Sequence, residues 1–206
     1  LLEVFGKAVD PNIEIADCQG ADSTDPAQLA QIVQYIESAN LIVYCISSRN
    51  GLRQSDIGFL KLIKRLGLFE NIVFLNNCDL TEHENLMDLK SIESRIIEEL
   101  ALFSVTPKLY SFSALFDLFL AGGSRLAKKN RIRLQAWKEE GQMAKHSLEN
   151  SRQFHHDFSQ RLGQQHFNLL ISNHLERLEI MIHTLDKKAS MSIEVLGSDH
   201  HGQEKV

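Results

Sequence analysis

Residues 13–20 (Ile13-Glu14-Ile15-Ala16-Asp17-Cys18-Gln19-Gly20) begin with a short apolar run that stops at an aspartate, and a glycine follows three residues later. Two more apolar runs have the same character: residues 41–46, and residues 71–75, which lead into Asn76-Asn77-Cys78-Asp79. Apolar runs of this length, rich in β-branched residues and separated by helical patterns, indicate a parallel sheet covered on both faces. Because ligands of such sheets bind beyond the carboxyl ends of the strands, we expect the functional residues at that edge.

The chain up to Leu115 completes an alternating α/β pattern. Apolar residues at spacings of three and four predict helices over residues 26–38, 54–66 and 81–103, and Thr81 with Glu84 fits a capping box at the start of the third. A last strand is predicted after Pro107. The expected order is therefore β-α-β-α-β-α-β, with strands at residues 13–17, 41–46, 71–75 and 108–112.

The remainder of the chain is predicted to be helical. A spacing of three and four runs from Leu134 to Leu162, and a cleaner heptad seam follows at Phe167, Ile171, Leu175, Leu178, Ile182, Leu185 and Ala189. Such a seam is typical of a helix that packs against a partner helix, either within one bundle or in a homodimer. We predict a domain over residues 1–162, a joint at Gly163, the start of a helical neck or bundle over 163–196 and a disordered tail over 197–206.

Composition excludes several classes of protein. The chain has 206 residues, of which 43% are hydrophobic and 24% charged, with a formal net charge of -5, which argues against nucleic acid as the main partner. It has no apolar run of about 18 residues, as a membrane-spanning helix needs. Three cysteines without a CxxC spacing indicate a reduced cytoplasmic protein rather than a disulfide framework or a metal site. The start at Leu1, without a methionine, predicts a fragment of a longer protein.

Asp17 and Gly20 have the chemistry of a phosphate and metal site. A carboxylate at a strand end can hold a phosphate-bound Mg²⁺ through water, and a glycine three residues later lets a backbone N–H approach a terminal phosphate. The pair alone is weak, since Asp and Gly also favour ordinary turns.

Asn76, Asn77, Asp79 and the pair Ser113-Ala114 suit the base of a nucleotide. The Asp79 carboxylate can accept two N–H bonds from guanine, which selects against a purine that lacks these donors. Asn76 would brace neighbouring loops, and a backbone N–H after Ser113 could reach the guanine oxygen. Each segment alone fits a capped loop equally well. It is their order, each segment following a predicted strand, that favours a nucleotide site.

Residues 13–25, 47–56 and 74–80 together resemble the GTPase domain of bacterial dynamin-like proteins. The resemblance implies a partial P-loop GTPase domain of the Ras and dynamin kind, followed by the long helices of a neck. It also implies binding and hydrolysis of GTP with Mg²⁺, self-association through GTPase domains and neck, and remodelling of a membrane. A cytoplasmic protein in peripheral contact with the inner face of a membrane is expected on that basis.

The resemblance carries over residue by residue. Asp17 matches the aspartate that holds Mg²⁺ through water, and Gly20 matches the glycine that senses the γ-phosphate. Asn76 and Asp79 match the guanine-reading pair, with Asn77 between them. Ser113 and Ala114 match the last, weak motif. No catalytic residue is assigned.

Several departures from the family pattern bear on activity. Gln19 replaces the usual proline, Asn77 replaces the lysine whose stem packs on the base, and Ala21 stands where small GTPases carry a glutamine. No Gly-x-x-x-x-Gly-Lys-[Ser/Thr] loop occurs in these residues, and no convincing switch threonine precedes Asp17. The chain alone is therefore predicted to be inactive. Truncation is the simpler explanation, and the alternative is a pseudo-GTPase that serves as a non-catalytic α/β and helical-hairpin interaction module.

One further feature is a run of basic residues after the last predicted strand, which comprises Arg125, Lys128, Lys129, Arg131 and Arg133. A solvated helix face is the ordinary interpretation of such a run, and contact with anionic lipid or an acidic partner is the alternative. Trp137, the single tryptophan, is predicted to belong to the core rather than to a ligand platform.

Overall fold

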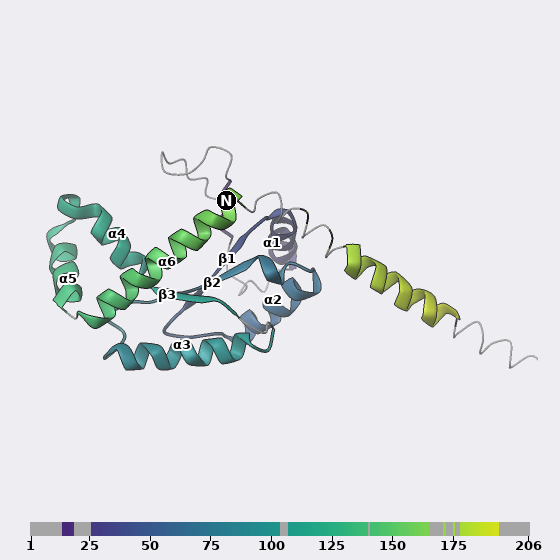
Figure 1. The fold of residues 1–206 in the computed structure, drawn as a ribbon, viewed down its shortest axis with the longest axis horizontal. Coiled ribbons are helices and arrows are strands. Elements are labelled where there is room, and N and C mark those ends of the chain that lie inside the picture. The colour runs from purple at the N-terminus through teal and green to yellow at the C-terminus, as the bar shows by residue number, and fades with distance from the viewer. Residues whose placement is uncertain are drawn as a thin grey trace, which may run out of the picture.

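The described residues form an α/β fold around a parallel sheet (Figure 1). The computed structural model describes residues 14–18, 26–103, 107–139, 141–164, 171, 175 and 178–193. Within them, strands β1 (Ile42–Ser47), β2 (Ile72–Asn77) and β3 (Leu109–Phe112) lie in the order β1-β2-β3, and both pairings are parallel. The three later predicted strands are thus confirmed, and the architecture is compatible with part of a Rossmann-like or P-loop-like fold.

The strand predicted at residues 13–17 is wrong for the residues that the structure describes. Residues 14–17 are not part of a strand, and Ile13 lies outside the described residues. An apolar run becomes a strand only when a neighbouring strand takes up its backbone N–H and C=O groups. Ile15 instead keeps 47% of its surface exposed, so the segment is not packed as a sheet strand would be.

Helices occupy most of the remaining described chain. They are α1 (Pro26–Ser38), α2 (Gln54–Arg65), α3 (Leu86–Leu100), α4 (Ala114–Gly122), α5 (Lys128–Glu139) and α6 (Gln142–Gln164), with short 3₁₀ turns η1 (Phe69–Asn71) and η2 (Gly123–Arg125) and a helix over residues 178–193. The first two predicted helices are confirmed to within a residue.

Helix α3 begins later than predicted, and the proposed capping box is wrong. The side chain of Asn85 caps the helix by accepting hydrogen bonds from the backbone N–H groups of Met87 and Asp88, at 2.9 and 3.1 Å. Thr81 does not cap a helix, because its hydroxyl donates to Asp79. Asn is as good an N-cap as Thr, so spacing alone could not decide between the two starts.

The continuous pattern predicted from Leu134 to Leu162 is broken in the structure. Helix α5 is separated from α6 at Gly141, which has a φ of +47°. A positive φ does not occur within an α-helix, and glycine adopts it more readily than other residues. The predicted joint at Gly163 lies one residue before the end of α6 at Gln164.

Different helices pack on the two faces of the sheet, but the prediction that both faces are covered holds only in part, since Val43 and Cys45 of β1 are exposed. On one face Ile46, Ile72 and Phe74 pack in a core with apolar residues of α1, α2 and α3. On the other face Val73, Leu75, Tyr110 and Phe112 pack against Phe154 of α6, which lies along β3 (Figure 1). The alternation of Ile72 and Phe74 with Val73 and Leu75 follows the two-residue period of a strand.

A third cluster lies beyond the carboxyl edge of the sheet and joins α4, α5 and α6. Its centre is Trp137, which is fully buried and packs against Phe116 and Phe119. The prediction that Trp137 belongs to the core is confirmed. In the part of the chain that the structure describes, no helix combines the length and apolarity needed to cross a bilayer.

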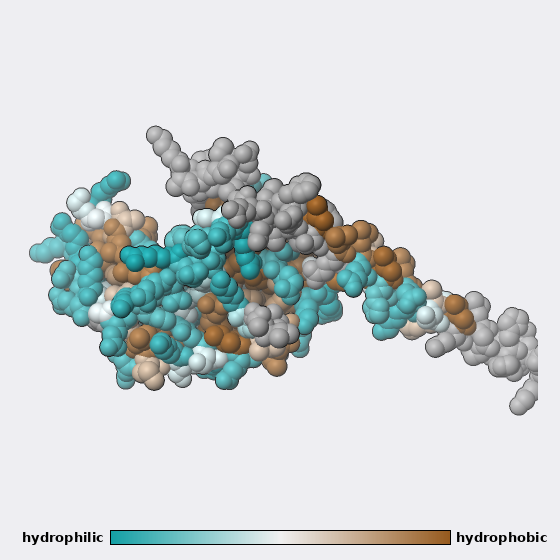
Figure 2. All heavy atoms as spheres, in the orientation of Figure 1, coloured by the Kyte–Doolittle hydropathy of each residue, from teal (hydrophilic) through white to brown (hydrophobic). Residues whose placement is uncertain are grey.

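The helix over residues 178–193 presents a stripe of exposed hydrophobic side chains (Figure 2). Leu178, Ile182 and Leu185 belong to the predicted heptad seam, and each keeps more than half of its surface exposed. These seam residues therefore form an apolar face that is exposed in this structure.

Candidate functional site

The ends of β2 and β3 bring two of the predicted motif segments together. Asn77 pairs with Phe112 in the parallel register, so the chain leaves both strands at the same level. The backbone N–H of Cys78 donates to the carbonyl of Phe112 at 3.0 Å, which prolongs the pairing beyond the strand. The Oδ1 atom of Asn77 then accepts a hydrogen bond from the backbone N–H of Ala114 at 3.1 Å. The segments 76–79 and 113–114 thus form one continuous edge.

The two asparagines of this edge have different surroundings. Asn76 is fully buried, and its Nδ2 donates to Ser111 Oγ at 3.1 Å, while its Oδ1 is buried without a partner. Asn77 is exposed and makes the bond to Ala114. Asn77 thus reaches the segment after β3, whereas Asn76 joins β2 to β3, because alternate strand residues point to opposite faces. The role of Asn76 in a nucleotide site stays a prediction.

Ser113 begins helix α4 rather than offering a free donor. Its hydroxyl accepts from the backbone N–H of Phe116 at 3.2 Å, and its own backbone N–H donates to Ser147 Oγ at 3.0 Å. The N–H of Ala114 is taken by Asn77. Both backbone donors after β3 are thus engaged in holding the edge together.

Asp79 lies just past β2 and is surrounded by donors. Its Oδ1 accepts from the backbone N–H of Thr81 at 3.0 Å and from the Thr81 hydroxyl at 2.7 Å. The Nη2 group of Arg133 donates to Oδ1 at 2.9 Å and to Oδ2 at 2.7 Å. Desolvation raises the pKa of Asp79, but the bonds from Thr81 and Arg133 outweigh it and hold the pKa below its usual value.

Arg133 is the neighbour of Asp79 that sequence reasoning did not single out. It comes from α5, and its guanidinium also lies over the ring of Trp137, 4.5 Å from the ring centroid. The sequence showed it only as one member of a basic run. Spacing of three and four residues in α5 places Arg133 beside Trp137, but nothing in the sequence predicts that α5 returns to the end of β2.

The predicted metal-binding half of the site is not joined to this edge in the described residues. Desolvation, and after it the charge of Asp17, raises the pKa of the Cys45 thiol, so Asp17 lies near β1, the strand at the other side of β2. Gly20 lies outside the described residues. The described part of the chain contains no cluster of three or more His, Cys, Asp or Glu side chains able to hold a metal ion. The magnesium role of Asp17 remains a prediction.

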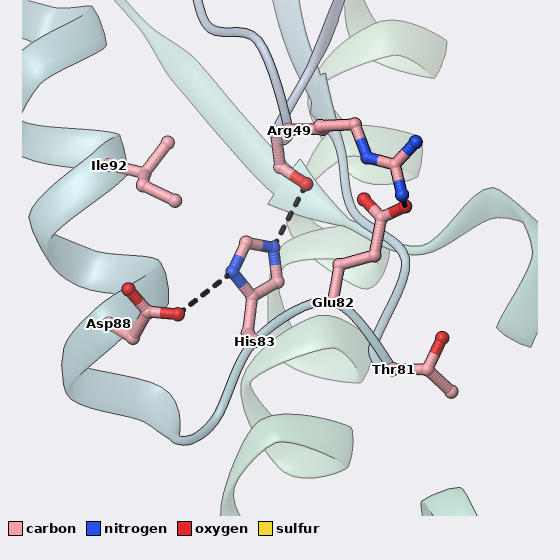
Figure 3. Close-up of a pocket in the computed structure, with 7 residues that line it drawn as sticks. Arg49, Thr81, Glu82, His83, Asp88 and Ile92 are labelled. Carbon is pink, nitrogen blue, oxygen red and sulfur yellow. Dashed lines mark hydrogen bonds and ion pairs between the residues drawn. The ribbon is translucent and has the colours of Figure 1, made fainter.

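A polar pocket of about 450 Å³ lies beside this edge, between the ends of β1 and β2 (Figure 3). In it, His83 Nε2 is 2.9 Å from Ser48 Oγ, and His83 Nδ1 is 3.4 Å from Asp88 Oδ2. Arg49 and Glu82 form an ion pair at its rim, at 2.8 Å.

The Ser48, His83 and Asp88 side chains have the order of a hydrolase triad, but the serine is not available as a nucleophile. Ser48 has no exposed surface, so its hydroxyl cannot meet a substrate in this structure. The His83 ring is also buried, and Nδ1 makes no hydrogen bond despite the nearby carboxylate. The arrangement ties the end of β1 to the loop after β2.

Comparison of the chain with models of protein families, with curated proteins and with solved structures gives no match. The function therefore has to be inferred from the residues that meet at the carboxyl edge of the sheet.

Proposed function

We propose that the chain provides the base-binding edge of a GTP-binding protein that resembles the dynamin-like GTPases. The observation that carries the proposal is the hydrogen bond from Ala114 N–H to Asn77 Oδ1 beside the Asp79 carboxylate, which unites the two segments expected to contact guanine. The complete protein would bind GTP and Mg²⁺, hydrolyse GTP and couple it to self-association and membrane remodelling. Phosphate-binding residues outside this edge would be needed for hydrolysis.

The chemistry of Asp79 supports guanine as the base. Both carboxylate oxygens face the same donor, Arg133 Nη2, so they are placed to accept the N1–H and N2–H groups of guanine, one on each oxygen. Asp79 is ionised at neutral pH like an ordinary aspartate, and the bonds from Thr81 and Arg133 lower its pKa further, so its carboxylate only accepts hydrogen bonds. Adenine has no such pair of donors on that edge and would leave the carboxylate unpaired.

The proposal is tested by titrating the chain with guanosine monophosphate and adenosine monophosphate and following backbone amide signals by NMR. Because the phosphate would be held weakly by this edge, we expect affinities in roughly the millimolar range. Guanosine monophosphate should shift the amides of Asn77, Asp79 and Ala114, and adenosine monophosphate should not.

Asp79→Asn should exchange the preference from guanosine to xanthosine monophosphate, because the asparagine amide can donate to the xanthine oxygen. Glu82→Gln, which alters a nearby carboxylate that is paired with Arg49, is the matched control and should keep the guanine preference. Equal responses to both purines, or an unchanged guanine preference in Asp79→Asn, would contradict the proposal.

The second candidate function is a non-catalytic interaction module, and the exposed apolar stripe on residues 178–193 favours it. On this alternative the sheet would be a platform, and the helix would bind a partner. The absence of any selective purine response, combined with an association that depends on Leu178, Ile182 and Leu185, would support the module instead.

A further inference from the structure

The guanidinium of Arg133 occupies the position in front of Asp79 that a base would need. Its Nη2 group reaches both carboxylate oxygens, at 2.9 and 2.7 Å, and its central carbon Cζ lies over the Trp137 ring, 4.5 Å from the ring centroid. The guanidinium is therefore held between the carboxylate, to which one of its nitrogens donates, and an aromatic ring.

The hydrogen-bonding capacity of Asp79 shows that Arg133 and a base cannot be accommodated together. An ionised carboxylate has about four lone-pair sites. Oδ1 already accepts from the Thr81 backbone, the Thr81 hydroxyl and Arg133, and Oδ2 accepts from Arg133. The two N–H groups of guanine would need the same two oxygens, so Arg133 has to leave before the base can bind.

The packing of α5 allows this departure without movement of the helix. Leu134 and Trp137 anchor α5 in the core and are buried, whereas the side chains of Arg133 and Asp79 are 36% and 33% exposed. A partly exposed ion pair of this kind is weak and screened by solvent. The arginine side chain can therefore swing into solvent while the helix stays in place.

We infer that Arg133 is an internal competitor for the purine base, which closes the base-binding edge until a nucleotide displaces it. The inference rests on the proposed function, since it assigns a regulatory residue to that same site. It makes Arg133 a determinant of affinity rather than a contact to the bound nucleotide. Its removal should strengthen binding, although it takes away a positive charge that would otherwise attract the phosphate.

The test measures the affinity of the full chain for guanosine monophosphate in the wild type, Arg133→Ala, Arg133→Gln and Arg131→Ala. Arg131 is an exposed arginine on the same helix, so its removal makes the same change in net charge. We expect both Arg133 variants to bind about three- to tenfold more tightly, because the binding-competent state no longer has to be opened. Arg131→Ala should bind equally or slightly more weakly, as the lost charge alone predicts.

Trp137 gives an independent signal, because it is the single tryptophan and its indole cross-peak is unique in an NMR spectrum. Loss of the guanidinium from the ring should move this peak in both Arg133 variants. Adding guanosine monophosphate to the wild type should move the peak toward the same position, since the nucleotide displaces the same side chain.

The possible failures can be told apart. If the wild type binds guanosine monophosphate selectively but both Arg133 variants bind equally or more weakly, the competitor inference is overturned and the proposed function stands. If no variant shows selective guanine binding while amide spectra confirm that all are folded, the proposed function fails and the inference fails with it. Arg133→Gln keeps most of the side-chain bulk, so it remains informative if Arg133→Ala does not fold.

Discussion

His83 joins the loop that follows β2 to the end of β1. It is buried, and its one hydrogen bond, from or to Ser48 Oγ, spans 2.9 Å between the loops after β1 and β2. Ser48→Ala would leave His83 Nε2 buried without a partner, so we expect the free energy of unfolding to fall by about 1–3 kcal/mol. Urea denaturation measures the change.

The control for this change is Ser91→Ala, at an exposed position of α3, which should alter stability by less than about 0.5 kcal/mol. If Ser48→Ala lowered the free energy of unfolding no more than the control, the His83 ring would have another hydrogen-bond partner. The bond between Ser48 and His83 would then not stabilise the fold.

Asn76 and Asn77 show why single-residue roles were hard to assign from the sequence. The segment 76–79 was correctly placed at the end of a strand, since its apolar run is unambiguous. Whether the first or the second asparagine braces the next loop depends on which face of β2 each one occupies, and that depends on the helices packed behind the sheet. Arg133 was missed for the same kind of reason, because its contact with Asp79 joins positions that are 54 residues apart.

An ion pair helps to attach helix α6 to the sheet. Asp157 accepts from Lys108 and Tyr110 of the β3 region, and these bonds, that of Lys108 first, lower the pKa of Asp157 to about 2. An aspartate in an unfolded chain has a pKa of about 3.9. The pair therefore stabilises the fold fully above about pH 4, and this contribution is lost as the pH falls toward about 2.

We expect the stability advantage of the wild type over Asp157→Asn to be constant near neutral pH and to shrink as the pH falls from about 4 to about 2. Thermal unfolding of both proteins across that range measures it. Glu149→Gln serves as the control on the same helix, since Glu149 is exposed and lies 3.9 Å from Lys145. A wild-type advantage that persists undiminished at pH 2 would contradict the assignment.

The sequence predicted the elements that have strong local signals. It did not predict features that depend on contacts with residues far away in the chain. The three strands at 41–46, 71–75 and 108–112 and the first two helices are self-evident from apolar spacing and are confirmed. The segment 14–17 is also rich in apolar residues but does not pair with any of the three strands, and it does not form one. Gly141 fits a heptad position on paper, yet its positive φ ends one helix and starts another.

The described chain combines a packed α/β part with a helix whose apolar side chains are exposed. The sheet and its helices bury their apolar residues in three clusters. The helix over residues 178–193 differs, since its seam residues are exposed. An apolar stripe of this kind is costly to leave in water, so a partner surface is expected.

The last prediction is that this seam drives association of the chain with itself. Leu178, Ile182 and Leu185 lie at heptad spacing and are 52%, 65% and 65% exposed, so two copies could interleave them as a coiled coil. We expect a weight-average mass that rises with concentration in sedimentation experiments. Ile182→Glu with Leu185→Glu should abolish the rise, because four carboxylates would then meet in one apolar seam. Thr184→Glu with Ser190→Glu adds the same charge outside the seam and should leave association intact. A wild-type mass that stays monomeric at every concentration would show that the seam is not self-complementary and is instead completed by a different helix.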